Sequence, residues 1–102
     1  MPKCKIEILA PAFKDIERIA EYHFKMVGPK SAEQITDSLL NTIKTLEDQP
    51  FAGSEHPDLL LLEQNYRKLV CGDYICIYKI IKKTIFIYRI VHGATDYPKS
   101  YK

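Results

Sequence analysis

The stretch YRKLVCGDYICIYKIIKKTIFIYRIVH, residues 66–92, decides the fold of this 102-residue chain. It contains three segments rich in Val, Ile, Tyr and Phe, separated by the polar breaks Gly72-Asp73 and Lys82-Lys83. Segments of this composition, joined by two-residue turns, are typical of antiparallel strands. We therefore predict a three-stranded β-meander as the centre of the domain.

The two turns also predict how the strands align. A two-residue turn at Gly72-Asp73 places Arg67 opposite Tyr78. One at Lys82-Lys83 places Tyr78 opposite Ile87 and Cys76 opposite Arg89. Because side chains alternate across a strand, this register gives the meander two faces. The first face carries Arg67, Leu69, Cys71, Tyr74, Cys76, Tyr78, Ile85, Ile87 and Arg89. The second face carries Lys68, Val70, Ile75, Ile77, Phe86, Tyr88, Ile90 and His92. Both faces are largely apolar. The second is more continuously so, which favours it as the face that packs against helices, and the first face is the alternative that the sequence leaves open.

The residues before the meander predict one strand and two helices. Apolar and charged side chains alternate over residues 4–9, which indicates a short half-buried strand. Pro11 suits the first turn of a helix, Gly28-Pro29 separates this helix from a second one, and Pro50 stops the second. The first helix has the apolar stripe Phe13, Ile16, Ile19, Ala20 and His23, with Asp15, Glu17 and Glu21 facing outward. The second helix has the stripe Ala32, Ile35, Leu39, Ile43 and Leu46.

This element order, β-α-α-β-β-β, predicts one α+β domain over residues 1–102. A helical hairpin packs on an antiparallel sheet in this fold. Residues 51–64 form a loop with four consecutive leucines, Leu59 to Leu62. These leucines either cap the core or stay exposed until a partner binds.

The composition excludes several classes of protein. No apolar run is long enough to span a membrane, and we expect no export leader. No glycine-rich phosphate loop is present. The three cysteines are an odd number without metal-ligand spacing, which favours free thiols in a reducing cytoplasm over a disulfide. We expect neither a cofactor nor a metal.

Charge is distributed unevenly along the chain. Residues 1–63 hold 7 Lys/Arg and 11 Asp/Glu, a net charge of −4, whereas residues 64–102 hold 8 and 2, a net charge of +6. A basic meander joined to acidic helices suggests an acidic or polyanionic partner on the basic side. A solvated lysine-rich surface is the alternative.

Several short motifs occur along the chain in a fixed order and spacing. They are A-x-x-D-I-x-x-I-x-x-Y at residues 12–22, L-x-x-x-P at 46–50, Y-R-x-L at 66–69, G-D-Y-x-x-x-Y at 72–78 and R-I-V-H-G-x-x-D-Y at 89–97. Together they resemble the RelE/ParE family of type II toxin–antitoxin toxins, which includes plasmid stabilisation proteins. The resemblance implies a cytoplasmic growth inhibitor that a cognate antitoxin neutralises in a hetero-oligomer.

The family divides by mechanism. RelE-like members are metal-independent endoribonucleases that cleave mRNA on the ribosome, and ParE-like members poison DNA gyrase. Ile75 stands where the nuclease pattern has an arginine, and Gly93-Ala94-Thr95 contains none. His92-Gly93 followed by Asp96 is more similar to the ParE-like ending. The resemblance therefore favours a ParE-like gyrase poison, with the RelE-like nuclease and a non-toxic, antitoxin-binding module as alternatives.

Candidate site residues follow from each mechanism. In a nuclease, Arg67 would hold the phosphate, His92 would accept a proton, and Tyr97 would orient or act as the acid. His92 could instead bond to Asp96. The candidates for partner binding are Arg67, Arg89, Lys82, Lys83 and Lys99, and the two arginines could instead pair with aromatic rings across strands. Tyr66, Tyr74, Tyr78 and Tyr88 either stack bases or pack in the sheet.

Overall fold

The computed structural model of the chain describes residues 3–55 and 65–93. Its elements are β1 (Lys5–Ile8), α1 (Ala10–Met26), α2 (Pro29–Lys44), the 3-10 turn η1 (Thr45–Glu47), β2 (Ser54–Glu55), β3 (Tyr66–Cys71), β4 (Tyr74–Ile81) and β5 (Thr84–His92). The predicted α+β order is therefore confirmed, with the two-residue strand β2 as an addition. The prediction for Leu59 to Leu62 lies outside the described residues.

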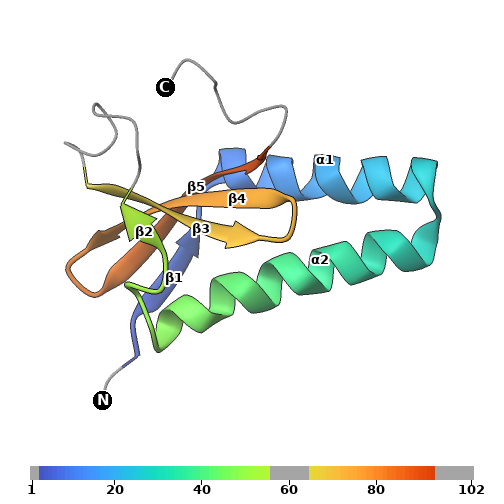
Figure 1. The fold of residues 1–102 in the computed structure, drawn as a ribbon. Coiled ribbons are helices and arrows are strands. Elements are labelled where there is room, and N and C mark those ends of the chain that lie inside the picture. The colour runs from blue at the N-terminus through green and yellow to red at the C-terminus, as the bar shows by residue number, and fades with distance from the viewer. Residues whose placement is uncertain (1–2, 56–64, 94–102) are drawn as a thin grey trace.

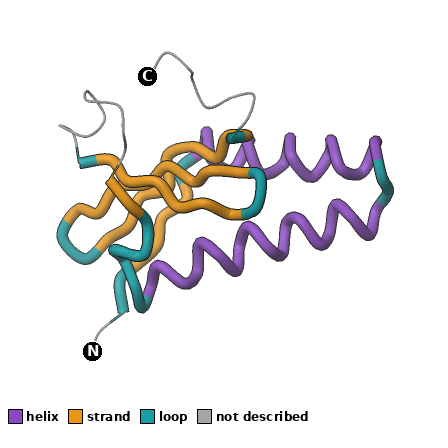
Figure 2. The backbone as a smooth tube through the Cα atoms, in the orientation of Figure 1, coloured by secondary structure: helices purple, strands orange, loops and turns teal. Residues whose placement is uncertain are grey.

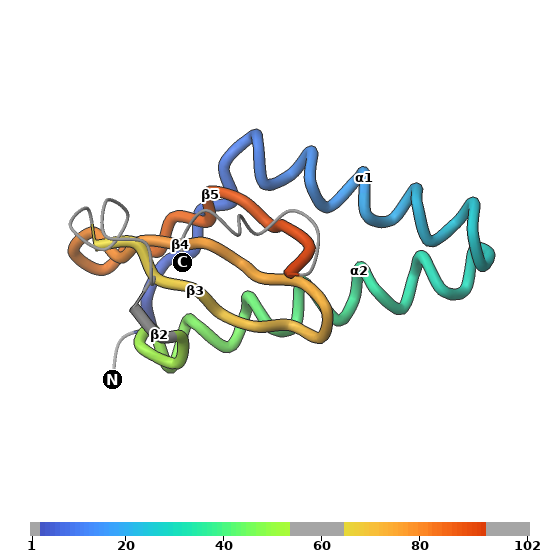
Figure 3. The backbone as a smooth tube through the Cα atoms, turned by 45° about the horizontal axis from the view of Figure 1, so that its top comes forward, coloured from blue at the N-terminus to red at the C-terminus, as the bar shows by residue number. Residues whose placement is uncertain are grey.

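The strands form one sheet in the order β1-β5-β4-β3-β2. β3, β4 and β5 are an antiparallel meander as predicted, and β1 joins the edge of β5 in parallel. The two helices form a hairpin against one face of this sheet (Figures 1 and 2). Beyond the turn that joins β3 to β4, the hairpin continues past the end of the sheet, as Figures 1 and 3 both show.

The predicted register holds for most of the meander. Arg67 pairs with Tyr78, and Tyr78 pairs with Ile87. The prediction that Cys76 faces Arg89 is wrong, because the register between β4 and β5 shifts at Ile77/Tyr78 and Cys76 pairs with Ile90. A β-bulge inserts one residue into a strand, so alternation beyond it changes face. The extra residue here is Tyr88, since Ile87 and Arg89 pair with consecutive residues of β4.

The face that packs against the helices is the first face, the less favoured of the two alternatives. The buried core includes Cys71, Tyr74, Cys76, Tyr78, Ile85 and Ile87 from the first face, together with Ile90, which the bulge brings to that side. These side chains meet Ala12, Ile16, Ile19, Leu39, Ile43 and Leu46 from the helical layer. Large tyrosine and isoleucine side chains thus fill the core, although their face has the less continuous run of apolar residues in the sequence.

Two residues of α1 also differ from expectation. Phe13, assigned to the apolar stripe, is 54% exposed, and Asp15, assigned to the outer surface, is only 2% exposed. The predicted stripe of α2 is correct at its centre, where Leu39 and Ile43 are buried. All three cysteines are free thiols, and Cys71 and Cys76 are buried, as predicted.

Candidate partner-binding surface

Asp15 closes the edge of β5 at the point where β1 ends. Leu9 still donates its N–H to the Ile87 carbonyl, and then the chain turns into α1. One turn later the Asp15 carboxylate accepts hydrogen bonds from the backbone N–H of Ile90 at 2.9 Å and from Arg89 Nε at 2.7 Å. The carboxylate therefore satisfies a strand edge that would otherwise be buried without a partner. Arg89 is held to the fold by this pair.

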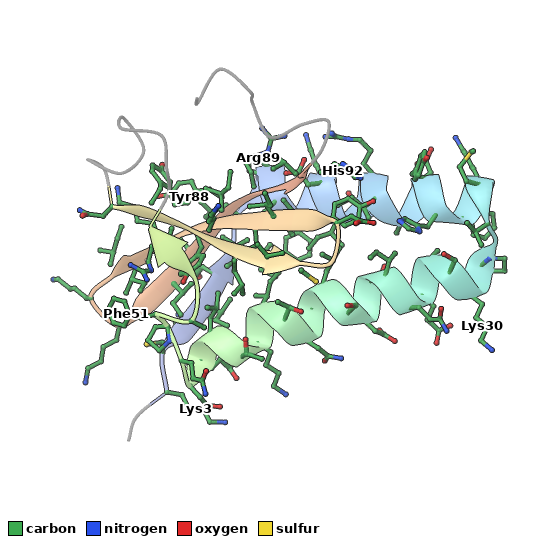
Figure 4. The ribbon with its side chains drawn as sticks, viewed as in Figure 1. Lys3, Lys30, Phe51, Tyr88, Arg89 and His92 are labelled. Atoms are coloured by element: carbon green, nitrogen blue, oxygen red, sulfur yellow. The ribbon has the colours of Figure 1, made fainter. Side chains whose placement is uncertain are left out.

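The Arg67 side chain also contacts other parts of the fold. Its Nη2 donates to the Gly53 carbonyl at 2.5 Å, and its guanidinium lies 5.1 Å from the centre of the Phe51 ring. Its partner across the strands, Tyr78, fixes the same segment by donating to the Pro50 carbonyl at 2.9 Å and accepting from the Gly53 N–H at 3.1 Å. Arg67 and Tyr78 thus anchor the segment before β2, which also contains Phe51 (Figure 4).

His92 contacts the buried Tyr74, which in turn reaches the helical hairpin. Its ring meets the Tyr74 ring edge to face at 5.3 Å, and the Tyr74 hydroxyl lies 3.2 Å from His23 Nε2. His23 Nδ1 lies 3.2 Å from the Ser31 hydroxyl on α2. This chain of contacts connects β5, β4, α1 and α2. The proposed bond to Asp96 lies outside the described residues.

The three nuclease candidates are not brought together among the described residues. Arg67 belongs to the cross-strand row with Tyr78, and His92 belongs to the row with Tyr74, four residues away along β4. Four residues of strand span about 13 Å, too far for one phosphate to contact both side chains. Tyr97, the third candidate, and Lys99 lie outside the described residues.

The second face of the meander is the open one. Three cross-strand rows cross it: Val70–Ile75–Val91, Lys68–Ile77–Arg89 and Tyr66–Lys79–Phe86. Val70 is 60% exposed, although it lies in a row that is entirely apolar. Ile75, which replaces the arginine of the nuclease pattern, lies in the same row and is 9% exposed.

Two tyrosines on the open face pack against each other, and one of them also contacts a lysine. The Tyr66 and Tyr88 rings meet edge to face at 4.9 Å, and Lys79 Nζ lies 5.0 Å above the Tyr66 ring. Burial, followed by the neighbouring Tyr88, raises the pKa of Tyr66. Packing in the sheet therefore accounts for these two tyrosines, while Tyr74 and Tyr78 belong to the core.

Positive charge is concentrated in the meander. Residues 65–93 contain six Lys/Arg and one acidic residue, Asp73, so their net charge is +5. Lys82 and Lys83 are exposed in the turn between β4 and β5, and Lys82 adopts a φ of 57°. This turn was among the partner-binding candidates predicted from the sequence, whereas Lys68, Lys79 and Val70 were not. The strand alternation had placed Lys68 and Val70 on one face, and the pairing of Lys79 with Tyr66 and Phe86 adds Lys79 to it.

Other kinds of site receive no support from the described residues. The Cys76 thiol is not a ready nucleophile, because burial and the nearby Cys71 raise its pKa to about 12. Residues 3–55 and 65–93 contain no cluster of three or more His, Cys, Asp or Glu able to hold a metal ion. No helix in the described part of the chain has the length and apolarity needed to cross a membrane.

Comparison with known proteins identifies the family. Residues 6–97 match the family model described as the ParE toxin of type II toxin-antitoxin system, parDE. The chain belongs to the ParE toxin family. The resemblance to RelE/ParE toxins found in the sequence motifs is thereby confirmed. No curated protein sequence matches the chain significantly.

Solved structures of toxin–antitoxin systems share this ParE fold. One is the chromosomal ParDE system from P. aeruginosa, with a TM-score of 0.75 and 18% identity over 88% of this chain and 96% of that chain. Another is the RelBE2 toxin–antitoxin complex from Mycobacterium tuberculosis, with a TM-score of 0.65 and 18% identity over 90% of this chain and 99% of that chain. At this identity the two structures establish the shared fold.

Proposed function

We propose that this ParE-family toxin arrests growth in the cytoplasm by binding DNA gyrase, and that a cognate antitoxin neutralises it. One observation carries the preference for binding over RNA cleavage. Arg67 and His92 lie on the helix-covered side of the sheet, in cross-strand rows that are at least about 13 Å apart along β4. Each is packed against other parts of the fold. Acid–base cleavage needs such groups within hydrogen-bonding reach of one phosphate.

The surface of the protein supports a need for partners. Tyr22, Phe24, Met26 and Val27 are all more than half exposed near the end of α1. Val70 adds an exposed apolar side chain on the open face of the sheet. Exposed apolar groups of this kind mark protein contacts. Both structural neighbours described above come from toxin–antitoxin systems, which supports an antitoxin as one of these partners.

Inducible expression in a bacterial host tests this function. Expression of the toxin alone should arrest growth, and co-expression of the neighbouring antitoxin gene should relieve the arrest. The earliest response should be DNA damage, and the purified toxin should inhibit supercoiling by purified gyrase. Rapid cuts in ribosome-bound mRNA, with supercoiling unaffected, would instead identify a RelE-like nuclease. Antitoxin binding without growth arrest would identify a non-toxic binding module.

A further inference from the structure

We propose that the turn between β4 and β5, together with the start of β1, binds the phosphate backbone of the DNA on which gyrase acts. This inference rests on the proposed function and adds a nucleic-acid contact to it. The basic site consists of Lys82 and Lys83 in the turn and Lys5 at the start of β1. It lies at the opposite end of the molecule from the connection between the two helices, as Figures 1 and 3 both show.

The sheet brings these three lysines together from opposite ends of the sequence. Lys5 donates its backbone N–H to the Lys83 carbonyl at 2.8 Å, and it pairs with Thr84 in the parallel ladder between β1 and β5. All three lysines are exposed. Lys5 belongs to residues 1–63, whose net charge is −4, so counting charges along the sequence does not reveal this cluster.

No ion pair between the residues that the structure describes uses one of these lysines. The ion pairs within residues 3–55 and 65–93 join Asp15 to Arg18 and Arg89, and Glu21 to Lys25. The sequence from 74 to 93 also contains no Asp or Glu, so neither strand that leads into the turn supplies a carboxylate. The positive charge of the basic site is therefore available to an anion.

The backbone conformation of Lys82 indicates that its side chain has a role beyond the turn. Lys82 occupies the first of two turn positions with a φ of 57°, in the left-handed region. The turn between β3 and β4 has a φ of 59° at the same position, and there the residue is Gly72. A residue with a Cβ is less stable than glycine in this region. A lysine is thus unfavourable for the turn itself, and a functional need for its charge explains its presence.

The spacing of the three lysines fits one strand of a nucleic-acid duplex. Neighbouring strands of a sheet are about 4.8 Å apart, so Lys5 and the two turn residues lie within about 10 Å of one another. Phosphates follow one another about every 3.4 Å along the axis of each DNA strand, so this distance covers about three phosphates. Each lysine is a flexible point charge that can contact a different phosphate. Glu7, two residues after Lys5, limits the site to this end of the sheet.

The composition of the basic site favours duplex DNA over a protein or single-stranded RNA. Protein interfaces are depleted in lysine and centre on apolar groups, whereas lysine contacts to phosphates dominate DNA binding without sequence preference. Unpaired bases bind by stacking on aromatic rings. The turn and the two residues that flank it, Ile81 and Thr84, have no such ring. A phosphate backbone therefore satisfies this site better than either alternative.

Fluorescence anisotropy of a short labelled DNA duplex with the full-length toxin, at several salt concentrations, tests the inference. Lys82→Gly/Lys83→Gln removes both charges of the turn, and Lys5→Gln removes the third charge of the site. Lys14→Gln/Lys30→Gln is the matched control, because it removes two exposed charges from the helices. Lys82→Arg keeps the charge in the turn. Inhibition of gyrase supercoiling and binding of the antitoxin are measured for the same variants.

We expect Lys82→Gly/Lys83→Gln to bind the duplex at least about tenfold more weakly at physiological salt, and Lys5→Gln about threefold. Each phosphate contact contributes about 0.9 to the slope of log K against log salt, so the turn variant should lose about 1.8 of that slope. Lys82→Arg and the helix control should stay within about threefold of wild type. The turn variant should also inhibit gyrase less and unfold thermally at or above the wild-type temperature, because glycine suits a φ of 57°.

Several results would overturn the DNA contact while leaving the toxin function intact. They are equal losses of affinity in the turn variant and the helix control, wild-type DNA binding by the turn variant, and loss of antitoxin binding in its place. Tighter binding of single-stranded RNA than of the duplex would also contradict it. A turn variant much less stable than wild type would show that Lys82 serves the fold. A wild-type toxin that neither arrests growth nor inhibits gyrase would contradict the proposed function itself.

Discussion

Asp15 on α1 and Arg89 on β5 form a two-point ion pair across 74 positions of the sequence, with Nε–Oδ2 at 2.7 Å and Nη2–Oδ1 at 3.1 Å. Asp15 also accepts the N–H of Ile90 and pairs with Arg18 at 3.2 Å. One buried carboxylate therefore joins the first helix to the last strand, which explains why a charged residue lies inside the fold.

Replacing Asp15 by alanine should destabilise the protein by about 2–3 kcal/mol, because the Ile90 N–H would remain buried without an acceptor. Arg89 is 48% exposed, so water can solvate part of its guanidinium and limit the loss. Glu17→Ala removes an exposed carboxylate from the same helix and should change the unfolding free energy by less than about 0.5 kcal/mol. Urea denaturation measures both variants, and similar losses in the two would show that Asp15 contributes little.

Gly53→Ala should destabilise the protein by about 3 kcal/mol or more, because an added Cβ would overlap the Lys68 carbonyl and lie 2.7 Å from the Tyr78 hydroxyl. Accommodating the methyl group would break the bonds that anchor residues 50–53. Gly93→Ala is the contrast, since its nearest neighbour would be 3.3 Å away. Thermal unfolding should therefore occur at a clearly lower temperature for Gly53→Ala than for Gly93→Ala. A Gly53→Ala protein as stable as wild type would mean that this segment moves away easily.

The buried Cys76 thiol should make stability depend on pH in the alkaline range. Burial and Cys71 raise its pKa from an ordinary value of 9.0 to about 12 in the folded state. Below pH 9 both folded and unfolded states hold the proton. Between pH 9 and 12 only the unfolded state releases it, so stability should fall by up to about 1.4 kcal/mol per pH unit. Urea denaturation at several pH values should show a shallower decline in Cys76→Ala.

The same burial predicts how the thiols react. Near neutral pH, Ellman's reagent should modify Cys4 in the folded protein, since Cys4 is only partly buried, and reach Cys76 after unfolding. Cys4→Ser should remove the fast phase of the reaction with Ellman's reagent. Fast modification of Cys76 in folded Cys4→Ser would show that this part of the core opens readily.

His92→Gln should retain growth arrest, because the proposed mechanism needs no proton acceptor at this position. Loss of a general base would instead reduce cleavage about 10²–10⁴-fold. Neutralising Lys82, Lys83 and Lys99 in turn should reduce toxicity gradually if they contact the target. Colony counts after induction measure each variant, with circular dichroism as the folding control. Complete loss of toxicity in a folded His92→Gln protein would support the nuclease.

The sequence was sufficient to predict the strands of the meander and their first turn. Gly72 adopts a φ of 59°, which glycine tolerates, and this turn aligns Arg67 with Tyr78 as predicted. The bulge at Tyr88 could not be predicted, because no glycine or proline marks it and the residues around it are all compatible with a regular strand. The faces of Arg89, Ile90 and His92 were consequently assigned wrongly.

The role of Asp15 could not be read from helical spacing. In the first helix it looks like one of several exposed acids, and its burial depends on the strand edge that β1 leaves uncovered. Arg67 and His92 were singled out as candidates for phosphate binding and proton transfer, and the structure shows both in contacts within the fold. Their partners, Gly53 and Tyr74, come from tertiary packing, so a role in catalysis and a role in the fold looked alike in the sequence.

The bulge at Tyr88 also divides β5 into two parts whose buried positions follow opposite alternation. Before it, Ile85 and Ile87, at odd-numbered positions, are in the core, and after it the buried position is even-numbered Ile90. If Tyr88 were instead paired with Ile77 in a regular ladder, the end of the strand would turn over, exposing Ile90 and placing the charged Arg89 in the core. The extra residue at Tyr88 is therefore what allows one strand to place Ile90 in the core and Arg89 beside Asp15.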